Sequence, residues 1–332
     1  MIRFLTRRLG YMALTLLLVS VVSFVIIQAA PGDYAEIYAA KKAATGAVIT
    51  QADIEAMRVE LGLDQPVYVQ YVRWMWNALH GDFGMSWAWK RPVGEVIAER
   101  LPVTLAIAFA TLLFMYAVSI PVGIYSAVRR YSVGDYAFSI LGYVGLAIPN
   151  FLLALVLLYW SQQYLGQSVG GLYSPAFENA PWSWGKFVDL MAHLVVPVIV
   201  LGTSGTAFLT RAMRAAVLDE LDRMYVLSAR ASGLSPMQVL LRYPVRTALN
   251  PIASTLGWRL TYVISGAPIV GFVLALPDTG PLFLNALLNQ DMMLAGAMIF
   301  IYCALTIIGT FVSDVLLVLL DPRIRLEGRR WP

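Results

Sequence analysis

Six long apolar runs, separated by polar segments, dominate the pattern of this 332-residue chain. They cover residues 9–30, 101–128, 138–160, 194–210, 252–276 and 294–320. Each is near or above the ~20 residues that a helix needs to cross a bilayer. The pattern therefore predicts an all-α polytopic membrane protein with six transmembrane helices.

The runs also predict how the chain is organised. We expect an N-terminal transmembrane helix over 1–30, an external loop with short helices over 31–100, a transmembrane domain over 101–320, and a tail over 321–332. The first run is longer than the apolar core of a cleaved signal peptide, so we interpret it as a permanent span.

Positive charge predicts the orientation of the spans. With six spans, sixteen of the 24 Lys and Arg residues, Arg259 included, fall on the side of the N-terminus. Short loops such as Arg129-Arg130 carry most weight, because long loops cross the membrane regardless of charge. We therefore expect a multi-pass protein of the cell (inner) membrane, in contact with lipid, with both termini in the cytoplasm. The net charge of +4 needs no nucleic-acid partner.

Two amphipathic helices are expected in the external loop, one over residues 51–61 and one starting at Pro66. Four tryptophans accompany them, at positions Trp74, Trp76, Trp87 and Trp89. Tryptophan is enriched at the membrane interface, so these residues are consistent with an aromatic belt and packing helices. The alternative interpretation is a docking surface for a substrate-delivering protein.

A polar island lies between the fourth and fifth runs. Its pattern predicts two short helices, the first ending at Gly233 in the left-handed C′ position. The second begins with Ser235 as N-cap, Pro236 at N1 and Gln238 in a capping box. Small residues at this elbow allow its backbone to approach the surface of a partner closely, and arginines surround the elbow. The alternative interpretation is an ordinary amphipathic loop at the membrane surface.

The sequence Tyr225-Val-Leu-Ser-Ala-Arg-Ala-Ser-Gly-Leu234 resembles the EAA loop of ABC importer permeases, in the form used by the oligopeptide and dipeptide permease family. Leu227 replaces the acidic residue that names the motif. The resemblance implies that the coupling loop, 211–251, docks on an ATPase. The residues implied in coupling are Ala229, Arg230, Ala231, Ser232, Gly233, Leu234, Ser235 and Pro236.

Further segments resemble the first permease subunit of peptide importers over essentially the whole chain. They are Ala30-Pro-Gly-Asp33, Leu61-Gly-Leu-Asp-Gln-Pro-Val-Tyr-Val-Gln-Tyr71, Gly81-Asp-Phe-Gly84, Arg91-Pro-Val93, Glu99-Arg-Leu-Pro-Val-Thr104 and Asp321-Pro-Arg-Ile-Arg325. The resemblance implies a type I ABC importer transmembrane domain. It also implies a second homologous permease, two ABC ATPase subunits that bind ATP and Mg, and an extracytoplasmic solute-binding protein.

Two charges fall inside predicted spans, Arg259 in the fifth and Asp314 in the sixth. Intramembrane charges are costly unless they are paired or face water. Both lie roughly 10 Å from the cytoplasmic edge by helical rise. We expect them to pair or share a polar network, although snorkelling of Arg259 and capping by Asp314 would also explain them.

Prolines and glycines mark where spans bend. We expect bends at Pro149, Pro197 and Pro268, and a broken fifth span that contains Gly266 and Gly271 and is followed by Pro277, Gly280 and Pro281. Irregular backbone at membrane depth is tolerated where it lines a cavity. We therefore place the translocation pathway beside the third, fourth and fifth spans.

Other classes of function are disfavoured. No Gly-x-x-x-x-Gly-Lys-Ser/Thr loop is present, so the chain is not expected to be an ATPase, an enzyme or a nucleotide-binding protein itself. One cysteine, Cys303, and two histidines, His80 and His193, make a metal site improbable. A self-sufficient secondary transporter or channel would show repeated halves, which we do not find. An intramembrane serine enzyme fails because Gly202-Thr-Ser-Gly-Thr206 departs from the Gly-x-Ser-x-Gly pattern.

The cargo is open at this point. Oligopeptides or dipeptides follow from the resemblance. The segment Val270-Gly-Phe-Val-Leu-Ala-Leu-Pro-Asp-Thr-Gly280 departs from the pattern of peptide carriers, which keeps oligosaccharides or opines as alternatives.

Overall fold

The structure is a computed structural model that describes residues 2–29, 49–165 and 170–320, together with positions 35, 36, 39, 40 and 43. The 30–33 motif and the tail over 321–332 lie outside the described residues.

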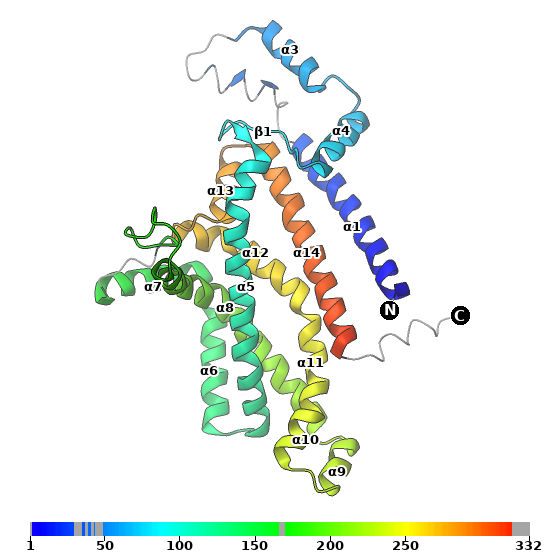
Figure 1. The fold of residues 1–332 in the computed structure, drawn as a ribbon, viewed down its shortest axis with the longest axis vertical. Coiled ribbons are helices and arrows are strands. Elements are labelled where there is room, and N and C mark those ends of the chain that lie inside the picture. The colour runs from blue at the N-terminus through cyan, green and yellow to red at the C-terminus, as the bar shows by residue number, and fades with distance from the viewer. Residues whose placement is uncertain are drawn as a thin grey trace. The chain divides into compact units, whose positions relative to one another are not determined.

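Helices make up most of the described chain (Figure 1). In chain order they are α1 (Ile2–Gln28), α3 (Gln51–Leu61), α4 (Val67–Leu79), α5 (Val93–Val128), α6 (Val133–Ala147), α7 (Asn150–Trp160), the π-helix η1 (Ser161–Leu165), α8 (Trp184–Leu221), α9 (Met224–Ala231), α10 (Pro236–Arg242), α11 (Pro244–Ser254), α12 (Leu256–Val273), α13 (Thr279–Leu288) and α14 (Met292–Leu320). Two short strands, β1 (Met85–Ser86) and β2 (Arg91–Pro92), pair antiparallel. The all-α prediction is confirmed.

Five described helices, α1, α5, α8, α12 and α14, are long and apolar enough to cross a membrane. The predicted third span is different, because α6 and the segment 150–164 meet at an angle of 102°. They count as a sixth span only if the bent pair is taken together. The bend lies at Pro149, which has extended backbone and N-caps α7. A proline disfavours helical backbone in the residue before it, here Ile148, so α6 ends there.

The predicted break of the fifth span needs correction. The interruption falls at Thr255, between α11 and α12, whereas α12 continues through Gly266, Pro268 and Gly271. The helix α8 is continuous through Pro197, where a bend remains a prediction. A proline removes one intrahelical hydrogen bond, and a span can tolerate that loss where neighbouring helices support it.

The described residues form two compact units, and the range given for each unit refers to its described residues only. One unit comprises residues 1–10, 103–281 and 305–332, and within it α8 packs against α6, α7, α11 and α12. Glycines permit close contact: a Cβ on Gly257 of α12 would lie 2.6 Å from the Thr310 Cα of α14. This unit contains all the candidate sites described below.

The other unit comprises residues 11–102 and 282–304. Its apolar core joins the start of α5 to α13 and α14, with Val93, Leu282, Leu294 and Met298 almost fully buried. The buried Asp291 carboxylate accepts hydrogen bonds from the Ser86 hydroxyl at 2.5 Å and from the Leu294 amide at 3.2 Å. It therefore ties the β1–β2 hairpin to the first turn of α14.

Both amphipathic helices expected between residues 31 and 100 form where the sequence predicts them. Thr50 caps α3 through a capping box with Asp53, and α4 begins after Pro66. The Trp74 side chain is buried between Phe24 and Phe300, at ring-centroid distances of 5.9 and 6.0 Å. Trp74 is therefore a packing residue, whereas Trp76 is 64% exposed.

Candidate functional site

The polar island folds as an elbow of two short helices, α9 and α10, which we call the elbow (residues 224–242). Gly233 has φ +81°, the left-handed conformation predicted for it. The Gln238 amide donates to the Ser235 hydroxyl at 3.4 Å, and the Ser235 amide donates to the Gln238 side chain at 3.2 Å. The predicted capping box is thus confirmed.

A small apolar cluster holds the two helices of the elbow together. Val226 and Ala229 of α9 and Val239 of α10 are buried, and Leu234 and Tyr243 pack against them. The methyl side chain of Ala229 lets the helices approach closely. A fixed turn and a packed interior give the elbow a defined shape before any partner arrives.

The elbow presents most of the predicted coupling residues outward. Arg230, Ala231, Ser232, Gly233, Ser235 and Pro236 are exposed, Leu234 is half-buried, and Ala229 is buried. The four arginines predicted to surround it, Arg223, Arg230, Arg242 and Arg246, are also exposed.

Exposed apolar side chains on the elbow were missed by the sequence analysis. Met224 is 77% exposed, Met237 62% and Leu241 53%. The same helices also carry the buried Val226, Ala229 and Val239, so the sequence alone does not show which of their apolar residues face outward.

Tyr225 connects the elbow to the end of α8. Its hydroxyl donates to the Glu220 carboxylate, and its ring lies 6.2 Å from that of Tyr243. Burial and the hydrogen bond to the Glu220 carboxylate raise the pKa of Tyr225, so the phenol keeps its proton.

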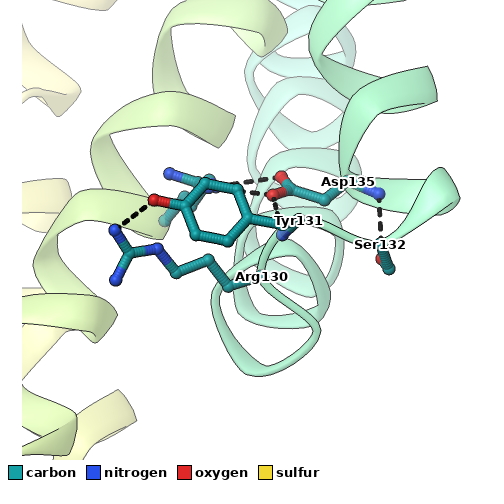
Figure 2. Close-up of polar contacts among 5 residues, drawn as sticks. Arg130, Tyr131, Ser132 and Asp135 are labelled. Atoms are coloured by element: carbon teal, nitrogen blue, oxygen red, sulfur yellow. Dashed lines mark hydrogen bonds and ion pairs between the residues drawn. The ribbon is translucent and has the colours of Figure 1, made fainter.

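A buried ion pair fixes the loop between α5 and α6 (Figure 2). The Asp135 carboxylate accepts from Arg214 Nε at 2.9 Å, from Arg214 Nη2 at 2.8 Å and from the Tyr131 amide at 3.0 Å. Tyr131 has φ +63°, and the Asp135 amide donates to the Ser132 hydroxyl at 3.2 Å. One carboxylate thus holds a strained turn and joins α6 to α8.

Asp135 and Arg214 were not singled out from the sequence. In the sequence, Asp135 looks like an ordinary acidic residue in the first turn of a helix that Ser132 caps. Arg214 looks like one of several positive charges in a long loop. Only the packing of α6 on α8 brings them together.

The two charges inside the spans have different neighbours from those predicted. Asp314 of α14 forms an ion pair with Arg8 of α1 at 2.9 Å. The guanidinium of Arg259 lies over aromatic rings, 3.9 Å from the ring centroid of Trp258 and 4.3 Å from that of Phe208. Helical rise set a common depth for the two residues, but it carries no information on which way each side chain turns about its helix.

A metal or cofactor site is not indicated. Among residues 2–29, 49–165 and 170–320 and the few described positions between them, no group of three or more His, Cys, Asp or Glu residues could hold a metal ion.

Comparison with protein families gives two matches that cover most of the chain. Residues 119–326 match the model described as "Binding-protein-dependent transport system inner membrane component". Residues 1–108 match the N-terminal model of the same kind of component.

Individual relatives match over nearly their full length. The oligopeptide transport system permease protein AppB of Bacillus subtilis is 36% identical over 93% of this chain and 95% of that protein. The dipeptide transport system permease protein DppB of Escherichia coli K12 is 29% identical over 98% of this chain and 99% of that protein.

A solved structure shares the fold. A chain of the inward-facing MetNI methionine ABC transporter matches with a TM-score of 0.51 and 17% identity, covering 68% of this chain and 96% of that chain.

Proposed function

Because this chain belongs to the family of binding-protein-dependent transport system inner membrane components, we propose that it forms half of the pathway of a peptide importer. It is a permease subunit of an ABC importer, with several apolar helices in the inner membrane. The observation that carries the coupling part of the proposal is the elbow, a preformed turn that displays small, basic and apolar side chains.

Peptides are the proposed cargo. AppB is named an oligopeptide permease and DppB a dipeptide permease, and both match along almost the whole chain. The segment 270–280 keeps oligosaccharides or opines as the competing cargo. Specificity would rest mainly on the external solute-binding protein, whose ligand decides between them.

The proposed assembly has a second homologous permease, two ABC ATPase subunits and a solute-binding protein outside. ATP and Mg would be bound by the ATPases, and the coupling segment 211–251 would dock on one of them. Exposed Met224 and Met237 would enter a groove of the ATPase, and Arg230 and Arg242 would meet acidic or carbonyl groups at its rim.

The proposed orientation places both termini and the elbow in the cytoplasm. The support is the excess of arginine on that side, including Arg129, Arg130, Arg211 and Arg214 near span ends. ATP is cytoplasmic, so the elbow would meet the ATPases there.

Purification of the chain from its native membrane in a gentle detergent tests this proposal. We expect a second permease, ATPases and a solute-binding protein to co-purify, and the reconstituted complex to hydrolyse ATP faster when the binding protein carries a peptide. A chain that purifies alone and transports in liposomes without ATP would refute the proposal. A complex stimulated only by an oligosaccharide or opine would refute the peptide part alone.

A further inference from the structure

Arg259 is a buried cation with two donor nitrogens that have no hydrogen-bond partner among the described residues. Only 4% of the residue is exposed, and the two nitrogens are Nε and Nη2. Aromatic rings cover the guanidinium instead, contributed by Trp258, Phe208 and, at 5.9 Å, Tyr262. A ring face attracts a cation but accepts no conventional hydrogen bond comparable to those from a carboxylate.

The covering rings are themselves open to the outside of the unit. Trp258 is 45% exposed, Phe208 39% and Tyr262 38%. Trp258 and Phe208 meet edge to face at 5.7 Å, one from α12 and the other from α8. A movement of these two side chains would therefore uncover the guanidinium.

Arg259 lies on a polar face of α12. Thr255, Arg259 and Tyr262 follow at spacings of four and three, so they share one side of the helix. Thr255 hydrogen-bonds Tyr116 of α5 at 2.8 Å, and Tyr262 hydrogen-bonds Ser204 of α8 at 3.0 Å. Paired hydroxyl groups thus flank the arginine on both sides along α12.

No carboxylate of the described residues forms an ion pair with Arg259. Asp314 pairs with Arg8, and Asp135 with Arg214. A buried charge without an opposite charge or full hydrogen bonding is expensive, so an arginine retained in this state calls for an anion from outside the described chain. Planar guanidinium suits a carboxylate, which it can bind with two parallel hydrogen bonds.

We propose that Arg259 receives a carboxylate of the transported peptide as it passes along α12. This inference rests on the proposed peptide function and adds a specific subsite to it. Trp258 and Phe208 hold the guanidinium while the site is empty. The carboxylate displaces these rings and takes up the Nε and Nη2 donors, and the hydroxyl groups of Thr255 and Tyr262 border its path.

The test compares two probes, trialanine and trialanine with an amidated C-terminus. The reconstituted full complex transports each probe from its own solute-binding protein, loaded to saturation as measured separately by calorimetry. Initial uptake rates are measured for wild type, Arg259→Gln, Arg259→Lys and the control Arg129→Gln. The Arg129 guanidinium also lies over a ring, that of Tyr125 at 5.9 Å, but Arg129 is exposed and lies outside the coupling segment 211–251.

We expect wild type and Arg129→Gln to transport the free acid about tenfold faster than the amide, the scale of one charge-assisted contact. Arg259→Gln should bring the ratio close to one by slowing the acid, and Arg259→Lys should restore part of the preference. An acid-to-amide ratio that Arg259→Gln leaves unchanged would overturn the inference but leave the peptide function standing.

Two other outcomes separate the sources of the anion. If Arg259→Gln releases the second permease on size-exclusion chromatography, the carboxylate belongs to that subunit and the substrate inference is wrong. If wild type transports neither probe and no other peptide, although it transports an oligosaccharide or opine, both the peptide function and this subsite are refuted.

Discussion

The ion pair between Asp135 and Arg214 gives the sharpest prediction about stability. Replacing Asp135 by Asn removes the negative charge but keeps an oxygen that can still accept from the Tyr131 amide. The side chain of Asp135 is 4% exposed and that of Arg214 27%. The substitution therefore leaves a guanidinium largely buried without its partner.

The magnitude follows from the geometry. Removing one partner of a buried ion pair costs about 3–5 kcal/mol. Arg214 retains some access to water, so we expect about 3 kcal/mol, roughly a hundredfold in the unfolding equilibrium. The double variant Asp135→Asn with Arg214→Met has no stranded charge and should lose less than either single variant.

The assay is equilibrium unfolding in mixed micelles of the two single variants, the double variant and the control Arg130→Met. Arg130 contacts Tyr131 on the surface, with its guanidinium 4.4 Å from the ring centroid, so its loss should cost below about 1 kcal/mol. The double-mutant cycle isolates the coupling between Asp135 and Arg214. Additive losses, or an Asp135→Asn loss no larger than that of the control, would refute this reasoning.

Three further predictions concern single residues. Gly257→Ala should destabilise the protein by about 1–3 kcal/mol, because the new methyl group would lie 2.6 Å from the Thr310 backbone. In the control Gly266→Ala, in the same helix, the nearest atom is at 3.8 Å, an ordinary contact distance. Thermal unfolding should therefore show a lower stability for Gly257→Ala than for Gly266→Ala. Gly233→Ala should cost about 1 kcal/mol of stability because of the left-handed backbone, but it should leave the stimulation of ATP hydrolysis intact. Gly233→Arg also meets open space within the chain, yet its long side chain should block docking and abolish this stimulation. Stimulated ATP hydrolysis in Gly233→Arg would count against docking of the elbow. Ser235→Ala should cost about 1 kcal/mol and increase hydrogen exchange in α10, which an unchanged exchange rate would contradict.

Local chemistry made the elbow predictable. Gly233, Ser235 and Gln238 act on their own backbone neighbours, so the sequence is enough to place the turn and the capping box. The same holds for α3, whose cap Thr50 and N3 residue Asp53 lie three positions apart. Most helical spans also follow from hydropathy, but hydropathy did not show the 102° bend of the third predicted span or the interruption of the fifth at Thr255. The helix α8 begins ten residues before its predicted apolar run because polar residues extend the helix beyond it.

Side-chain partners across helices were not predictable in the same way. Asp135 and Arg214 are 79 positions apart, and Arg8 and Asp314 come from opposite ends of the chain. Helical periodicity gives depth along a span, but rotation about the axis depends on which helices pack against it. The sequence therefore did not show that Asp314 pairs with Arg8, or that Arg259 lies against Phe208 of α8.

One helix connects the features argued above. Along α8, Phe208 covers Arg259, Arg214 holds the loop of Asp135, and Leu221 ends the helix just before the elbow. Seven residues separate Arg214 from Leu221 and thirteen separate Phe208 from it, about 10 Å and 20 Å at 1.5 Å per residue. A continuous helix is stiff over such lengths, so displacement of the elbow should shift Phe208 and Arg214 together. A helix-breaking Gly-Gly pair at positions 215 and 216, Ala in this chain, should therefore weaken ATP-driven transport while ATPase binding survives; full coupling in that variant would show that α8 does not carry the motion.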